Sequence, residues 1–250
     1  MDNFNAMKAK NDCVAWIRDW FEHNGPGCNA VIGISGGKDS SVVAALCVEA
    51  LGKDRVAGVL MPNDYQADLA DSYLLCEYLG VKHMVINIGS TVEGLKSHIN
   101  KYVEVSDQTI INLPPRIRMT TLYAVSQSIY GRVACTDNLS ERYIGYSTRW
   151  GDSIGDFAPL ANLTSDEVVA IGDACGLPYE LTHKTPSDGL CGKTDEDNFG
   201  FSYATLNKYI RTGICEDKEV KVKIDMMHEK NLFKLMPMPT FEYKGDTNDN

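Results

Sequence analysis

The sequence predicts an α/β protein in which helices cover both faces of a doubly wound, mainly parallel sheet. Short apolar runs alternate with segments of helical periodicity between residues 5 and 136. These runs lack the strict apolar–polar alternation of a sheet with one wet face, which indicates that both faces are buried. Right-handed crossovers between parallel strands would then lay the helices against the sheet.

Each element follows from its local pattern. Val14, Ile17 and Phe21 fall at helical spacing within residues 5–23, and the turn sequence NGPG ends that helix. Four apolar runs are expected to be strands: residues 29–34, 55–61, 83–88 and 132–136. Four intervening segments are expected to be helices: residues 39–51, 67–79, 91–102 and 120–130, with Gly52 as a C-cap.

The last third of the chain has fewer strand signals. The sequence TSDE at residues 164–167 is a capping box that opens a helix through Ala174, and residues 202–210 form a further short helix. Residues 182–200 are polar and rich in turn formers, so we expect a functional loop that becomes ordered when substrates bind. No linker divides the chain, which predicts one domain over residues 1–250 with a disordered tail at about 245–250.

Composition limits the class of function. The net charge of −10 and the pI near 5.0 disfavour non-specific binding to nucleic acid. No apolar stretch approaches the roughly 20 residues that a membrane helix needs, and no signal peptide precedes the first helix. Eight cysteines are scattered without a CxxC pair, as is typical of reduced thiols in a cytoplasmic protein.

The sequence GISGGKDSS at residues 33–41 lies at the junction between the first expected strand and the helix that follows it. Gly36 and Gly37 lack Cβ, so their backbone can approach a bound group and adopt positive φ. A helix that begins there directs free N–H groups and the positive end of its dipole towards the ligand crevice. With the hydroxyls of Ser35 and Ser40, this loop is suited to phosphate or pyrophosphate.

Asp39 makes that loop a candidate site for a metal–nucleotide complex. A carboxylate beside phosphates is repulsive unless a cation lies between them, and Mg²⁺ takes one or two carboxylates together with phosphate oxygens. The alternative is that Asp39 merely caps the helix and the glycines form a tight turn. The patterns GxxxxGK[ST] and GxGxxG are both absent from this loop, which excludes two common nucleotide loops.

The sequence SGGKDS resembles the pyrophosphate loop of the ATP-pyrophosphatases, which have a Rossmann-like fold of the adenine nucleotide alpha-hydrolase type. Further stretches are similar to the ammonia-dependent NAD synthetase family over roughly residues 10–240. They are LMP at 60–62, PRIRMT at 115–120, TDNLSERYIGYSTRWGD at 136–152, GDFAPLANLT at 155–164 and KTPSDGL at 184–190.

This resemblance implies a reaction. The nicotinic acid carboxylate of deamido-NAD attacks the α-phosphorus of ATP, pyrophosphate leaves, and ammonia attacks the resulting acyl-adenylate to give NAD and AMP. The protein would position the reactants, neutralise charge and exclude water. The chain has no room for an additional amidase domain, so free ammonia is the expected nitrogen donor, although a separate glutaminase subunit stays possible. The family also implies a homodimer.

The resemblance further implies three sets of site residues. Those expected to bind ATP are Gly33, Ile34, Ser35, Gly36, Gly37, Lys38, Asp39, Ser40, Thr136, Ser165 and Ser187. Those expected to bind deamido-NAD are Arg116, Arg149, Asp156, Phe233 and Lys234. Asp39 and Glu141 are expected to hold Mg²⁺, and these two residues and Lys184 to be catalytic.

Three positions depart from the family pattern. Ser165 stands where relatives commonly carry a lysine that contacts phosphate, and Lys38 or Lys184 is the hypothetical substitute. Arg149 replaces a usual lysine, which keeps the charge but changes the geometry. Phe233 and Lys234 are the nearest match to a His-Lys pair, and packing is the simpler interpretation of Phe233.

Two other functions stay open at this stage. A tRNA-adenylating enzyme would share the loop but need a basic face, which the acidic composition argues against. A non-catalytic nucleotide-binding module would bind ATP without releasing AMP, and it would leave Asp39 and Glu141 without a metal to hold.

Overall fold

The sheet is the centre of the fold. The structure, a computed structural model, describes residues 4–64, 69–184 and 194–243. Four parallel strands lie in the order β3-β2-β1-β4. They are β1 (Asn29–Gly33), β2 (Val56–Leu60), β3 (Lys82–Val85) and β4 (Gly131–Val133). The chain runs from β1 towards β3 on one side and returns to β4 on the other, so the strand order reverses between β1 and β4.

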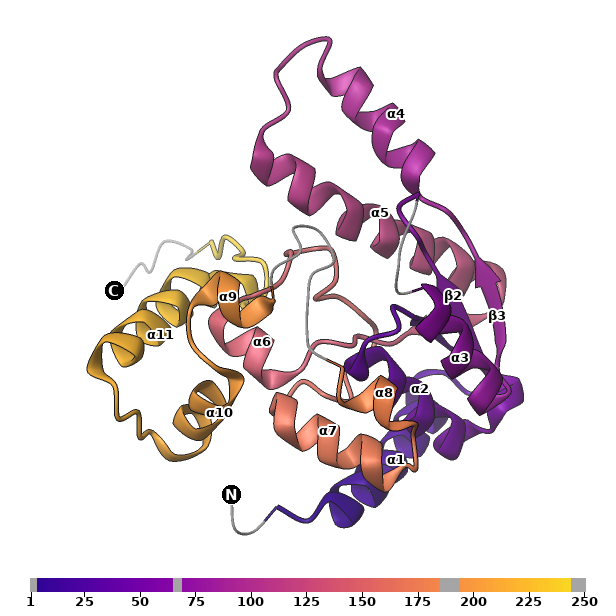
Figure 1. Cartoon of the computed structure of the whole chain (residues 1–250). Helices are drawn as coiled ribbons and strands as arrows, with labels where there is room; N and C mark the ends of the chain where they lie inside the picture. The colour runs from indigo at the N-terminus through magenta and orange to yellow at the C-terminus, as the bar shows by residue number, and fades with distance from the viewer. Residues whose placement is uncertain (1–3, 65–68, 185–193, 244–250) are drawn as a thin grey trace, which may run out of the picture.

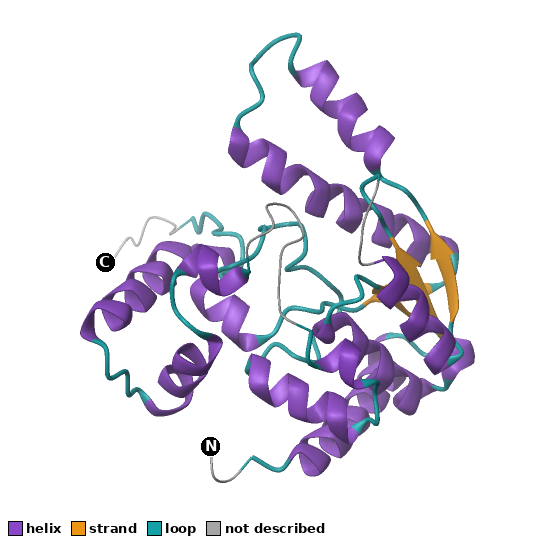
Figure 2. Cartoon of the chain, in the orientation of Figure 1, coloured by secondary structure: helices purple, strands orange, loops and turns teal. Residues whose placement is uncertain are grey.

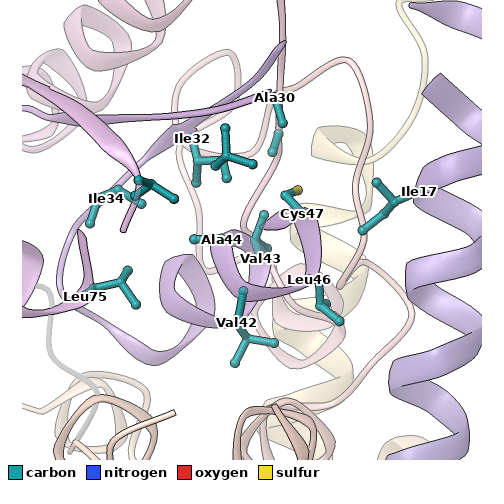
Figure 3. Packing of buried hydrophobic residues seen from close by; sticks show 14 of the residues in the cluster. Ile17, Ala30, Ile32, Ile34, Val42, Val43, Ala44, Leu46, Cys47 and Leu75 are labelled. Carbon is teal, nitrogen blue, oxygen red and sulfur yellow. The ribbon is translucent and has the colours of Figure 1, made fainter. Parts of the chain in front are cut away.

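Helices cover both faces of this sheet, which confirms the predicted fold class (Figures 1 and 2). Ala30 and Ile32 of β1 pack into one core with α1 (Ala6–Asn24), α2 (Lys38–Leu51), α3 (Leu69–Leu79) and α7 (Ser165–Ala174), as Figure 3 shows in part. Val31, which points the other way, packs with α4 (Gly89–Ile99) and α5 (Asp107–Ser128). Successive strand residues thus serve opposite cores.

A third apolar cluster holds the C-terminal helices together. Ile144, Phe199, Leu206 and Ile224 are buried there against one another. They come from α6 (Leu139–Ile144), α9 (Asp195–Phe199), α10 (Tyr203–Thr212) and α11 (Lys218–Asn231), which Figure 1 shows grouped at the left. The remaining elements are the short helix α8 (Tyr179–Thr182) and the 3₁₀ turns η1 (Lys53–Arg55) and η2 (Leu232–Lys234).

The structure differs from the sequence-based expectation in several helices. Helix α5 begins at Asp107 rather than at residue 120, because Ser106 caps it and the buried Leu113 and Pro114 compensate for two prolines inside it. Residues 195–199 were expected to be loop but form α9, which Thr194 and Asp197 open with a capping box. Helices α6, α8 and α11 were not predicted. No helix within residues 4–64, 69–184 or 194–243 has the length and apolarity to cross a bilayer.

Candidate active site

The glycine loop links β1 to α2 at the point where the strand order reverses, which is the usual ligand crevice of such sheets. Gly36 has φ of +79°, a conformation that side chains other than glycine rarely adopt. The Ser35 and Ser40 hydroxyls lie 3.1 Å apart, and the Ser40 hydroxyl also donates to the Gly37 carbonyl. Gly37 is the N-cap of α2 and has no side chain to cap the helix. The first N–H groups of the helix can therefore donate hydrogen bonds to a ligand.

Asp39 lies in the first turn of α2, and its carboxylate makes no capping hydrogen bond, which contradicts the capping alternative. Its Oδ2 accepts a 2.7 Å hydrogen bond from Lys38 Nζ. Its Oδ1 accepts a 3.0 Å bond from Asn138 Nδ2, and Asn138 follows β4 and caps α6. The carboxylate therefore fixes the glycine loop to the segment beyond the neighbouring strand, where Thr136 and Glu141 also lie.

Negative charge accumulates around the buried ammonium of Lys38. Burial and the neighbouring Asp39 raise the pKa of Glu141 well above its usual range. Burial lowers the pKa of Lys38, but Asp39 and Glu141 outweigh this and raise the pKa above its ordinary value. The Lys38 Nζ also lies 5.8 Å from the centre of the Tyr203 ring, and Asp195 interacts with the same ammonium. The site therefore has more carboxylates than cations.

This donor set fits a magnesium ion that is completed by nucleotide phosphates. Asp39 and Glu141 interact across the crevice, and a divalent cation would relieve the repulsion that raises the pKa of Glu141. No group of three or more histidine, cysteine, aspartate or glutamate side chains is arranged to hold a metal in the described part of the chain. Two carboxylates with phosphate oxygens and water suit Mg²⁺, whereas a closed structural metal site would need more protein ligands.

The buried carboxyl of Asp137 should make the free energy of unfolding depend on pH. Burial and the neighbouring Asp152 raise the pKa of Asp137 to about 8, and its Oδ2 is buried without a hydrogen-bond partner. Below its ordinary pKa near 4 the carboxyl is protonated whether folded or unfolded; between about 4 and 8 only the folded state keeps the proton. The free energy of unfolding should therefore fall as pH rises through this window. We expect Asp137→Asn to flatten the decline in thermal midpoint between pH 5 and 8, and parallel wild-type and variant profiles would contradict this.

Ser165 lies in a closed triangle of buried hydrogen bonds. Its hydroxyl accepts from Asn207 Nδ2 at 3.0 Å, and its backbone N–H donates to the Ser140 hydroxyl at 3.0 Å. The Ser140 hydroxyl in turn donates to Asn207 Oδ1. The triangle joins α6, α7 and α10, so the Ser165 hydroxyl already has a partner. That Ser165 contacts ATP stays a prediction.

Lys184 lies near the base of the expected loop and forms an ion pair of 2.6 Å with Asp71 of α3. The catalytic role assigned to Lys184 stays a prediction. Ser187, which was expected to contact ATP, lies outside the described residues.

The residues expected to bind deamido-NAD form two groups. Arg116 of α5 donates from Nε to the Arg149 carbonyl at 3.4 Å, and the Arg149 guanidinium lies over the ring of Phe233. Asp156 is engaged with the sheet, because its Oδ2 accepts from the Val133 N–H at 2.7 Å. Four of the five predicted residues, including Lys234, are therefore connected through the loop at residues 145–149, whereas Asp156 lies along β4.

Several polar residues of the site were missed by sequence reasoning. Asn138 could have been found, because an asparagine before a helical run is a capping signal. Asp195 and Tyr203 lie close to the Lys38 ammonium but are distant from it in sequence. Asp195 comes from the expected loop and Tyr203 from the helix predicted at residues 202–210. Asp137 and Asp152 carried no local signal, since their raised pKa values come from burial in the folded chain.

Comparison with known proteins identifies the family of the chain over almost its whole length. The sequence model of the NAD synthase family matches residues 9–241. The NH(3)-dependent NAD(+) synthetase of Pyrococcus furiosus is 40% identical over 181 residues, which are 72% of this chain and 70% of the relative. That of Alkaliphilus metalliredigens is 35% identical over 93% of this chain and 98% of its own length.

Solved structures show the same arrangement. An NMN synthetase from Francisella tularensis superposes with a TM-score of 0.89 at 29% identity and covers 96% of this chain and 100% of its own. An NH3-dependent NAD synthetase from Campylobacter jejuni superposes with a TM-score of 0.78 at 28% identity over the same shares.

Proposed function

The chain belongs to the NAD synthase family, and from this premise we propose that it is an ammonia-dependent ligase that converts deamido-NAD to NAD. The observation that carries the proposal is the glycine loop whose Asp39 faces Glu141 across the strand reversal, in a chain that matches this family almost from end to end. ATP would supply the adenylyl group, and AMP and pyrophosphate would leave.

The residues have separate tasks in this reaction. The N–H groups of the glycine loop and of the first turn of α2 bind phosphate oxygens, with the Lys38 ammonium beside them. Arg116 and Arg149 bind the acidic nucleotide and orient its carboxylate for attack. The carboxylates of Asp39 and Glu141 would hold Mg²⁺, which supplies neutralisation of phosphate charge when bound. Glu141 of α6, Asp195 of α9 and Tyr203 of α10 lie around Lys38, and these helices would limit the access of water to the activated acyl group.

One assay tests the proposal against the alternatives. Purified protein is incubated with ATP, Mg²⁺, ammonium and deamido-NAD, and AMP and NAD are quantified by chromatography. We expect equal amounts of both products. AMP that forms only when tRNA is added would favour a tRNA-adenylating enzyme, and ATP binding without AMP would favour a non-catalytic module.

A second candidate substrate is the acidic mononucleotide that corresponds to NMN. The observation that favours it is the TM-score of 0.89 to an NMN synthetase, compared with 0.78 to an NAD synthetase at similar identity. Both reactions amidate the same nicotinic acid carboxylate, so the glycine loop would serve either. The same assay with nicotinic acid mononucleotide in place of deamido-NAD decides between them through the ratio of kcat/KM values.

Lys38 is the stronger candidate to replace the missing lysine at position 165. Its ammonium is buried at the glycine loop, where it pairs with Asp39, whereas Lys184 pairs with Asp71 of α3. Removing a charged donor from phosphate costs about 1.5–3 kcal/mol, so we expect Lys38→Ala to raise the KM for ATP by roughly 10-fold or more. Lys184→Ala should have a smaller effect, and the exposed Lys82→Ala should have none. An unchanged KM in both Lys38→Ala and Lys184→Ala contradicts the hypothesis.

Assembly and location are also part of the proposal. Exposed apolar side chains gather along the α4–α5 hairpin, which projects from the sheet in Figure 1, and they support a homodimer. They include Leu95, Tyr102, Val103, Ile110 and Ile111.

The seven described cysteines are free thiols, which supports a reducing cytoplasm. The net charge of −10 works against binding to nucleic acid, while the local donors of the glycine loop would still bind a small anionic nucleotide. We therefore propose ATP, deamido-NAD and ammonia as the partners, with neither nucleic acid nor a membrane.

A further inference from the structure

The guanidinium of Arg149 lies between two aromatic rings. Its Cζ is 4.8 Å from the centre of the Trp150 ring and 5.3 Å from that of the Phe233 ring, which are both within cation–π range. Its Nε is buried and has no hydrogen-bond partner, and its side chain forms no ion pair with any described residue. An unpaired buried donor is costly to retain, so this N–H is suited to an acceptor that a ligand brings.

The neighbouring Arg116 gives the charge of that ligand. Its Nε donates to the Arg149 backbone carbonyl at 3.4 Å, so the Arg116 side chain lies against the backbone that carries Arg149. Among residues 4–64, 69–184 and 194–243, no carboxylate forms a salt bridge with either of them. Two cationic side chains that meet at one loop without a described counter-ion are suited to an anion, and planar guanidinium groups suit phosphate and carboxylate oxygens.

The turn η2 holds the backbone that carries Arg149. Lys234 donates from Nζ to the carbonyl oxygens of Gly145 at 2.7 Å and Ser147 at 3.0 Å. Asn231, just before the turn, donates to the carbonyl of Ile144 at 3.0 Å. The approach is close, because a Cβ on Gly145 would lie 2.2 Å from Asn231 Cβ. Asn231 and Lys234 thus hold the backbone at residues 144–147, while Phe233 of the same turn packs on the Arg149 guanidinium.

We propose that Phe233 and Lys234 are positioning residues that orient Arg149 towards an anionic oxygen of the pyridine nucleotide, and that they do not contact the substrate themselves. This inference rests on the proposed function, since it places the acidic nucleotide at Arg149. It replaces the expectation that both residues bind deamido-NAD directly. It also gives a reason for arginine at position 149, because the planar guanidinium stacks between two rings and a lysine ammonium does not.

Phe233→Leu tests the stacking. Leucine keeps apolar bulk but has no ring face, so KM for the acidic nucleotide should rise about 3-fold to 30-fold, the range expected for a lost cation–π contact. KM for ATP and the thermal midpoint should stay unchanged, and Phe233→Tyr should restore KM. Phe241→Leu is the matched control, because it removes an exposed aromatic ring from the same C-terminal segment. A rise in both KM values with a lowered midpoint would show a merely structural role and overturn the proposal.

A double-mutant cycle tests whether Phe233 acts through Arg149. In an Arg149→Lys background, Phe233→Leu should have little further effect on KM, because the stacked cation is already lost. Lys234→Met should raise the same KM, and Lys234→Gln, which keeps a donor, should raise it less. Effects of Phe233→Leu and Arg149→Lys that simply add would overturn the proposal.

Binding by calorimetry, with deamido-NAD or nicotinic acid mononucleotide and no ATP, separates this inference from the proposed function. A wild-type protein that binds either nucleotide more tightly than Phe233→Leu but releases no AMP would contradict the function and support the inference. Turnover with an unchanged Phe233→Leu variant would contradict the inference alone. A wild-type protein that binds neither nucleotide overturns both.

Discussion

Glu141→Gln is expected to abolish turnover while making the ligand-free protein more stable. The side chain lies close to Asp39, and burial together with this neighbouring charge raises the pKa of the carboxyl well above its usual range. Glutamine has the same shape but cannot ionise, so it cannot replace a carboxylate ligand of Mg²⁺. Loss of this charge stabilisation should lower kcat for AMP release by about 10³-fold.

The gain in stability should depend on pH in a defined direction. Above the ordinary pKa of glutamate, near 4.5, the unfolded chain ionises this group while the folded chain holds its proton. This difference lowers the free energy of unfolding of the wild type as pH rises, and Glu141→Gln removes it. Thermal unfolding without ligands should therefore show a higher midpoint for the variant at pH 7.5 and no difference below about pH 4.

A matched control separates charge from simple substitution. Glu77→Gln removes the same charge from an exposed position on α3, and neither turnover nor the midpoint should change. Asp39→Asn should lose activity to the same degree as Glu141→Gln. A Glu141→Gln variant that retains a tenth of wild-type activity would contradict the metal assignment. A variant that melts below the wild type at pH 7.5 would contradict the raised pKa of Glu141.

Gly155→Ala is expected to destabilise the protein strongly, because the added methyl group meets backbone atoms. An added Cβ would lie 2.5 Å from the backbone N of Cys135 and 3.0 Å from its Cα, so no side-chain rotation can relieve the contact. Residues 155–157 extend the sheet beside β4, where Asp156 N donates to the Val133 carbonyl and Cys135 N to the Phe157 carbonyl. Separating these backbones would weaken both hydrogen bonds.

The cost should reach about 3 kcal/mol, the upper range for overpacking, which corresponds to a fall of roughly 6–12 °C in the thermal midpoint. Phe157 packs on Trp20 and Phe21 at ring distances of 5.0 and 5.2 Å, so the disturbance should extend to α1. Urea unfolding measures the loss. Gly94→Ala is the control, since nothing lies within 4 Å of its added Cβ and alanine favours a helix. Equal midpoints for the two variants would contradict the expectation.

The sequence predicted those parts of the fold that are encoded by neighbouring residues. The glycine loop, the four strands and the capping box at Thr164 all follow from local chemistry. Helix α11 was missed because Ile224 is its only buried residue, so it carries no amphipathic signal. The start of α5 was missed because two adjacent prolines normally argue against a helix interior.

The contacts that define the candidate site could not be predicted in this way. Asp39 meets Asn138 across 99 residues of sequence, and Phe233 meets Arg149 only after α11 folds back on α6. The local sequence around each of these residues gives no indication of the contact. Resemblance to a family could nominate these residues as ligands, but only the folded chain shows that Asp156 is tied to β4 and that Lys234 is bound to a loop backbone.

The triangle of Ser140, Ser165 and Asn207 restricts how this protein can evolve. Each member satisfies the other two in a region closed to water, so replacing one leaves the others with stranded polar groups. A lysine at position 165 would therefore remove the acceptor of the Asn207 amide and require a second change at Asn207. The serine and its two partners should therefore tolerate substitution only when they change together.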